Sequence, residues 1–240
     1  MKKFVFTFAL TALSALTLSA QNEADKPSCQ DHCAHAAKAC WYNRDLFINL
    51  YAGCNAALGA PEAMDTKALK SWEIMLTVGP EIKLGKQSPF SLTIQAGVDW
   101  RNYRMTGSHY FAKDMETQQM VLRDVEADKD LHFSRIKTFS IVLPVLLHAD
   151  LGKGFNVGVG PMFSYVPFAT FLSDYSIKSG SLDYTERTSH VHQSKLAIDL
   201  MGQVTYKNLG LYLKYSPTNV IRKSFGPEFQ SLSFGLVWGI

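Results

Sequence analysis

From residue 46 onward, the chain alternates apolar and polar residues with a period of two, segment after segment. Successive side chains of a β-strand point to opposite faces, so this period predicts strands with one apolar and one polar face. Eight segments show the pattern, at 46–58, 69–84, 90–104, 133–151, 154–166, 195–206, 209–216 and 230–240. No apolar run after Ala20 is long enough for a membrane-spanning helix. We therefore predict an all-β, antiparallel fold of eight strands.

The segment 133–151 departs from the alternation, because its central stretch 142–147 (VLPVLL) is apolar on both faces. Pro144 within that stretch has no backbone N–H to donate to a neighbouring strand. We therefore expect a bulge or a locally weak pairing at Pro144.

The connections between the predicted strands alternate in length. The segments 85–89, 152–153 and 207–208 are short and rich in turn-forming residues. The segments 59–68, 105–132, 167–194 and 217–229 are long and polar. In an up-and-down sheet the two kinds then fall at opposite ends, as do the short periplasmic turns and long extracellular loops of outer-membrane barrels.

Aromatic residues mark both ends of the predicted strands, and by parity all of them lie on the apolar face. Trp72, Trp100, Tyr165 and Tyr215 stand next to the long connections, and Phe90, Phe155, Tyr206 and Trp238 stand next to the short turns. Burial in a soluble sheet would explain aromatic residues but not their clustering at both ends. Two aromatic belts are typical of an eight-stranded antiparallel up-and-down transmembrane β-barrel.

The N-terminus predicts the compartment. Lys2 and Lys3 precede an apolar run at 4–18, and small residues follow before Gln21. This order is typical of a secretory signal peptide. We predict a signal peptide at 1–20, a periplasmic Cys-containing segment at 21–44 and the barrel at 45–240. The formal net charge of +3 gives no reason to expect a nucleic-acid partner.

Several of these strands resemble a known family. The stretches 141–147 (IVLPVLL), 150–153 (DLGK) and 157–161 (VGVGP) are similar to the middle of the porin-like small outer-membrane β-barrel family (OmpX/OmpA-like barrels). The stretches 213–217 (LKYSP) and 231–236 (SLSFGL) are similar to its last two strands. The resemblance implies a closed barrel in the bacterial outer membrane, with outer-membrane lipids and the outer-membrane assembly machinery as partners. Such strand motifs specify a fold better than a function.

The lumen of an eight-stranded barrel is only wide enough to be filled by side chains. Parity directs a set of charged residues inward: Glu73, Glu81, Lys83, Asp99, Arg101, Asp199 and Lys214. Charges removed from water need partners. We therefore predict a network of ion pairs that closes the lumen, with a small-solute pore as the alternative.

His192 and Ser194 have the His-x-Ser spacing of lipid A deacylases, and the parity of their strand places both on the outer face. The neighbouring strand offers Lys214 and Tyr215 at this height instead of an acid. We interpret the segment as a polar strand extension and assign no catalytic residue, with a lipid-modifying enzyme as the second alternative. His190 and His192 alone do not complete a metal site, and we predict no cofactor.

The segment before the first strand carries Cys29, Cys33 and Cys40, with His32 and His35 between them. In an oxidising compartment these thiols favour a disulfide in which Cys40 is one partner. On one helical stripe they would instead form a soft metal site, and unpaired thiols are the third possibility.

The predicted function is a structural or surface-interaction role for an integral barrel with a closed polar lumen. The two longest connections mix aromatic and charged residues, which on a rigid barrel can bind a surface or ligand. The identity of an extracellular ligand is not specified by this composition.

Overall fold

The computed structural model describes most of the chain from residue 46 to residue 239. The described ranges are 46–64, 66–85, 88–105, 109–114, 116–117, 119–126, 128–177, 182–189 and 191–239. The predicted signal peptide, the cysteines at 29, 33 and 40, and His190 lie outside these ranges. Among the described residues, no helix is long and apolar enough to cross a membrane.

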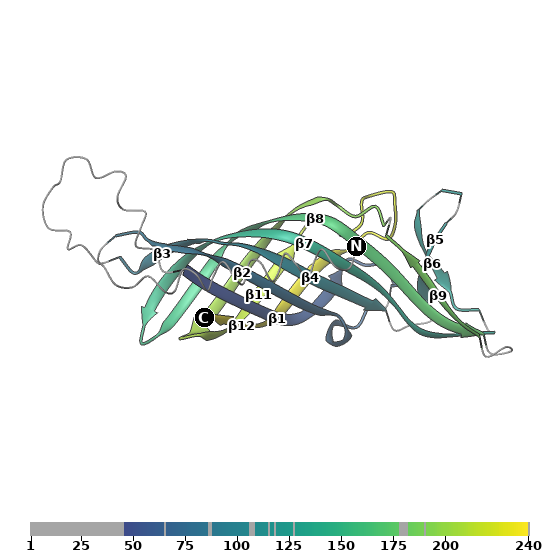
Figure 1. Cartoon of the computed structure of the whole chain (residues 1–240), viewed down its shortest axis with the longest axis horizontal. Helices are drawn as coiled ribbons and strands as arrows, with labels where there is room; N and C mark the ends of the chain where they lie inside the picture. Colours follow the sequence, from purple (N-terminus) through teal and green to yellow (C-terminus); the bar gives the residue numbers. More distant parts are fainter. Residues whose placement is uncertain are drawn as a thin grey trace, which may run out of the picture. The chain divides into compact units, whose positions relative to one another are not determined.

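Eight antiparallel wall segments form a closed ring (Figure 1). We call each segment a stave, because the third consists of two strands in line. Their strands are β1 (Leu46–Leu58), β2 (Trp72–Lys83), β3 (Phe90–Ile94) with β4 (Ala96–Met105), β7 (Lys129–Gly152), β8 (Phe155–Ile177), β10 (Leu196–Tyr206), β11 (Leu209–Ser216) and β12 (Gln230–Gly239). Neighbours along the chain pair with each other, and β1 pairs with β12 to close the ring. The predicted eight-stranded up-and-down barrel is confirmed.

The third stave is interrupted at Gln95, which separates β3 from β4 without a change of register. Prolines flank this point on both sides. Pro80 lies on β2, and the carbonyl of Pro144 on β7 accepts the Gln95 N–H at 3.0 Å. Neither proline has a backbone N–H, so neither β2 nor β7 can donate a hydrogen bond to the third stave at this point. Of the two expectations for Pro144, the locally weak pairing is found and the bulge is not: β7 continues past Pro144 without a register shift, and the interruption lies across from it at Gln95.

The strands β7 and β8 continue past the other staves and form an extension with β9 (Leu182–Thr188), as Figure 1 shows. The register between β7 and β8 shifts between Phe139 and Ile141, which reverses the outward parity of β8 beyond Pro167. A hairpin of β5 (His109–Lys113) and β6 (Met120–Asp124) packs on the extension. There the Phe111 N–H donates to Ser134 Oγ at 3.0 Å, and Ser173 Oγ donates to the Phe111 carbonyl at 2.8 Å. These loop strands were not predicted.

The outer face of the barrel is apolar. Exposed side chains on it include Leu50, Ile74, Leu76, Ile94, Ile141, Leu143, Val159, Phe163, Ile198, Leu200, Leu211, Leu213, Phe234 and Leu236. A contiguous apolar surface of this kind needs an apolar environment. A closed ring leaves no unpaired strand edge inside a bilayer, so the fold and its outer surface together specify a transmembrane barrel.

Candidate functional site: a charged layer across the lumen

Five charged side chains from four strands meet inside the barrel. They are Glu73 on β2, Asp99 and Arg101 on β4, Asp199 on β10 and Lys214 on β11, and all are buried. Each occupies an inward position of its strand, as the alternation of apolar and polar residues requires. The layer joins staves that are not neighbours in the sheet, since β4 and β10 are separated by β7 and β8.

Arg101 is central to one half of the layer. Its Nε lies 2.8 Å from Asp99 Oδ2, and its Nη2 lies 2.7 Å from Asp199 Oδ2 across the lumen. Lys214 connects the other half, with its Nζ 2.9 Å from Asp99 Oδ2 and bonded to Glu73. Breaking a buried pair by removing one partner leaves an uncompensated charge, so each contact constrains the next.

Hydroxyl groups donate to two of the three carboxylates, Asp199 and Glu73, whereas Asp99 Oδ1 is buried without a hydrogen-bond partner among the described residues. Ser164 Oγ donates to Asp199 at 3.2 Å, and Ser216 donates to the same carboxylate. Tyr212 Oη donates to Glu73 at 3.4 Å. These contacts replace the water that the two carboxylates lose on burial.

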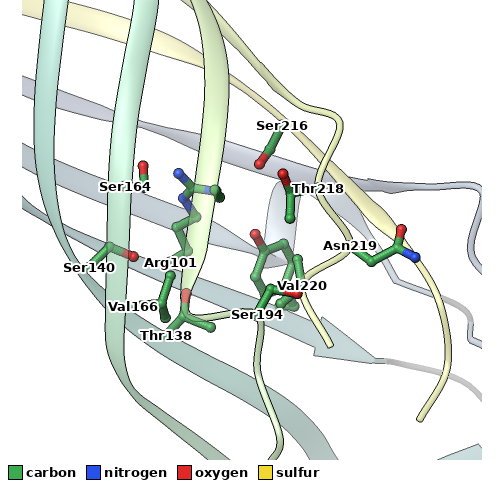
Figure 2. A pocket seen from close by; sticks show the side chains of 12 residues that line it. Arg101, Thr138, Ser140, Ser164, Val166, Ser194, Ser216, Thr218, Asn219 and Val220 are labelled. Carbon is green, nitrogen blue, oxygen red and sulfur yellow. The ribbon is translucent and has the colours of Figure 1, made fainter. Parts of the chain in front are cut away.

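On the side of the long loops, the layer is covered by an apolar core that these loops build. This loop core consists of Met64, Tyr103, Met105, Phe111, Met120, Ile136, Ala169, Phe171, Val191, Ile221 and Phe229. Between the loop core and the ions, a cavity of about 20 Å³ is lined by Arg101, Ser194 and Thr218 among others (Figure 2). That volume holds about one water molecule.

On the side of the short turns, the layer is covered by a second apolar core, made of Tyr51, Met75, Val142, Leu146, Met162, Met201, Tyr212 and Val237. Below it a polar cavity of about 190 Å³ is lined by Gln95, His148 and Gln203 among others. His148 lies 2.8 Å from Asn156 Oδ1 and 3.1 Å from Thr93 Oγ1. From top to bottom, the lumen thus consists of loop core, ions, apolar core and polar cavity.

Glu81 and Lys83 do not join the ion layer that was predicted to include them. Glu81 lines the polar cavity of about 190 Å³ and accepts a hydrogen bond from Ser91. Lys83 is exposed at the end of β2. Both lie near the end of the stave, where water can reach them and burial no longer forces charges to pair.

His192 and Ser194 do not share the outer face, contrary to the parity prediction. Residues 192–194 turn inward, where Ser194 N–H donates to the Val220 carbonyl and the His192 carbonyl accepts from Arg222, both at 3.0 Å. Ser194 lines the small cavity (Figure 2), whereas the His192 ring stacks on Phe225 with centroids 4.5 Å apart. The strand β10 begins at Leu196, so its parity does not extend to these residues.

The aromatic residues predicted for the two belts lie at outward positions. Trp72, Trp100, Tyr165, Phe90, Phe155, Tyr206 and Trp238 are exposed, and Tyr215 is half-buried with its hydroxyl 2.6 Å from Gln230. Phe155 and Tyr206 pack together near the periplasmic turns, with ring centroids 4.7 Å apart.

Sequence reasoning missed a polar layer just above the ions. Asn55, Ser231 and Ser233 are buried there, with Ser233 Oγ 2.6 Å from Asn55 Oδ1 and Tyr103 Oη 2.8 Å from Ser231 Oγ. Their inward parity was available from the sequence, but small uncharged residues give no signal of a network. Among the described residues, no group of three or more His, Cys, Asp or Glu could hold a metal ion.

The chain is similar in structure to known proteins, among them Ail and Neisserial surface protein A. No protein-family model matches the chain, and no curated protein matches it. The chain is similar to Ail, the attachment invasion locus protein of Yersinia pestis, with 8% identity and a TM-score of 0.36 over 81% of this chain and 97% of Ail. It is also similar to Neisserial surface protein A (NspA), with 13% identity and a TM-score of 0.34 over 80% of this chain and 96% of NspA.

The closed ring, the apolar outer face and the aromatic residues at both ends of the staves define the class of this molecule. Its polar interior and its division into short turns and long loops belong to the same class. The chain is an eight-stranded antiparallel β-barrel of the bacterial outer membrane.

Proposed function

We propose that this protein is a sealed outer-membrane barrel that presents its long loops at the cell surface. The observation that carries the proposal is the ion layer of Glu73, Asp99, Arg101, Asp199 and Lys214, which spans the lumen between two apolar cores. A permeating solute would have to separate these pairs, and each separation would leave a buried charge unpaired.

The surface role is supported by the extension of β7, β8 and β9. Its backbone is paired beyond the barrel wall, and the β5–β6 hairpin packs on its inner side through Ser134 and Ser173. Paired strands hold side chains in fixed positions, whereas free loops do not. The extension therefore suits the binding of a surface or ligand better than the transport of a solute.

The two alternatives have less support. A small-solute pore would need a path through the ion layer, and the cavity above that layer holds about one water molecule. A lipid-modifying enzyme would need His192 beside Ser194, yet these side chains face Phe225 and the small cavity, respectively.

Single-channel recording in planar lipid bilayers tests the seal. We expect no large, steady conductance steps from the unmodified protein. Replacing Glu73 and Lys214 together by Ala removes one cation and one anion from the ion layer, so this variant should leak. Glu62→Ala with Lys223→Ala removes the same charges at exposed sites and serves as the control. Large, steady conductance of the unmodified protein would refute the seal.

Thiol labelling on intact cells tests the surface role. In a background without native cysteines, Thr185→Cys on β9 should react with a membrane-impermeant maleimide. Lys153→Cys in a short turn should react only after the outer membrane is permeabilised. The reverse pattern would mean that the extension faces the periplasm and would overturn the proposed orientation.

A further inference from the structure

Four cations gather on the outward face of the extension. Arg104 on β4 is directly opposite Arg135 on β7, and Lys137 is the next outward residue of β7. Arg135 pairs with Leu172 of β8, and Leu172 pairs with Arg187 of β9. Directly paired residues lie on the same face of a sheet, so the four side chains form one cationic patch.

The cationic patch has too few anions within the protein. None of its four residues forms an ion pair with a residue of the described part of the chain. The Nε atoms of Arg104 and Arg135 are buried and have no hydrogen-bond partner there. Both guanidinium groups instead lie over the Phe133 ring, 5.2 and 4.7 Å from its centroid.

Burial and mutual repulsion both lower the pKa values of two residues of this patch. Burial lowers the pKa of Lys137, and the charges of Arg135 and Arg187 lower it further. Burial and the charge of Arg104 likewise lower the pKa of Arg135, which Asp174 partly offsets. Like charges directly opposite each other destabilise a sheet. A bound anion would relieve that cost.

An aromatic ladder lies directly beside the patch on the same face. The rings pack side by side across three staves. The Phe139 ring centroid lies 5.3 Å from that of Trp100 and 6.4 Å from that of Phe168. Lys137 is the outward residue two positions before Phe139, so the two lie about 7 Å apart along β7. Exposed aromatic rings mark the level of lipid headgroups, so the patch lies at or just above that level.

We propose that Arg104, Arg135, Lys137 and Arg187 bind the phosphate groups of an anionic lipid in the outer leaflet. Guanidinium groups match phosphate oxygens with paired hydrogen bonds, and none of the four cations has an anionic partner among the described residues. The aromatic ladder favours a lipid over free phosphate, because it offers apolar contacts next to the charges. This site does not depend on the sealed lumen, and a conducting barrel would leave it unaffected.

Lipid binding can be measured on the full chain in phosphatidylcholine nanodiscs, with diphosphoryl lipid A as the probe and its dephosphorylated form as the comparison. Arg104→Gln with Arg135→Gln should weaken diphosphoryl lipid A binding by about tenfold or more. Lys153→Gln with Lys207→Gln removes two exposed cations in the short turns, at the opposite end of the barrel from the patch, and should leave binding unchanged.

Thermal unfolding separates binding from folding. Without anionic lipid, the Arg104/Arg135 variant should unfold at the same temperature as the unmodified protein or at a higher one, because a repulsive pair has been removed. Diphosphoryl lipid A should raise the unfolding temperature of the unmodified protein alone. Equal binding by variant and unmodified protein, or equal binding of the dephosphorylated form, would overturn the proposal. Competition by millimolar inorganic phosphate with no lipid preference would overturn the choice of a lipid.

Discussion

At the scale of single residues, Lys214 is the cation with the least access to water. It exposes 1% of its surface and contacts both Glu73 and Asp99. Its long side chain reaches the ion layer from β11, the stave that neighbours β10 and β12. A cation in this position is tolerated only because two carboxylates receive it.

Replacing Lys214 by Met keeps the side-chain length and removes the charge. We expect the free energy of unfolding to fall by about 3–5 kcal/mol, because Glu73 and Asp99 would remain buried without their cation. Urea unfolding of the protein in detergent micelles measures this change. The control is Lys223→Met at an exposed site, which should change stability by less than about 0.5 kcal/mol.

A double variant, Lys214→Met with Glu73→Gln, should recover part of the lost stability, since the uncompensated charge is removed as well. A loss for Lys214→Met no larger than that of the exposed control would contradict the account of the ion layer.

Parity alone places Glu73, Asp99, Arg101, Asp199 and Lys214 inside the barrel, and the structure finds them there. Parity does not give the height of a residue, which separates Glu81 and Lys83 from the ions. It also fails where a strand ends. Ser194 was placed outside by extending β10 backward, although pairing with the segment 220–222 turns the chain inward there.

At the scale of the elements, the seam between β1 and β12 depends on two facing glycines. Gly53 pairs with Gly235, and the Tyr212 side chain lies against this pair. A Cβ at Gly235 would collide with the Ala52 carbonyl oxygen and with the Gly53 backbone. These contacts involve backbone atoms, so side-chain rotation cannot relieve them.

Gly235→Ala should therefore destabilise the closed barrel by about 1–3 kcal/mol or more. Retarded migration on unheated gels would report the loss of the folded form during refolding. Gly202→Ala on β10 is the matched control, because the nearest atom to its Cβ would be the Gly158 carbonyl oxygen at 4.0 Å. Equal folding yields for the two variants would show that the seam has room for a side chain.

The eight staves were predictable because their outer faces are apolar throughout. The extension was predicted only in part. Residues 133–139 of β7 belonged to a predicted strand, whereas the end of β8 beyond Val166 and the strand β9 were assigned to a loop. The register shift near Phe139 interrupts the period of two on β8. The cationic patch gave a partial signal, since Arg135 and Lys137 share one face of a predicted strand, but Arg187 was assigned to a loop.

At the scale of the whole molecule, different levels along the barrel axis carry different kinds of side chain. The membrane-facing wall is apolar, the ion layer spans the lumen between two apolar cores, and the extension carries exposed charge beyond the aromatic ladder. The alternation of short and long connections already predicted this polarity. How the long loops fold over the lumen depends on contacts between distant segments, such as Tyr103 with Phe229, which no local pattern encodes.

The closure of β1 on β12 is the most direct test of this architecture, because these strands lie at opposite ends of the described chain. In a variant with all native cysteines replaced by Ser, Ala57→Cys and Ser231→Cys occupy paired positions. Oxidation during folding should join them by a direct disulfide, which gels without reductant detect in isolated outer membranes and which needs no reagent to reach the buried position 231. Ala57→Cys with Val237→Cys should not cross-link, because Val237 pairs with Tyr51 instead. Equal cross-linking of both pairs, or none in either, would contradict the closed eight-stranded barrel.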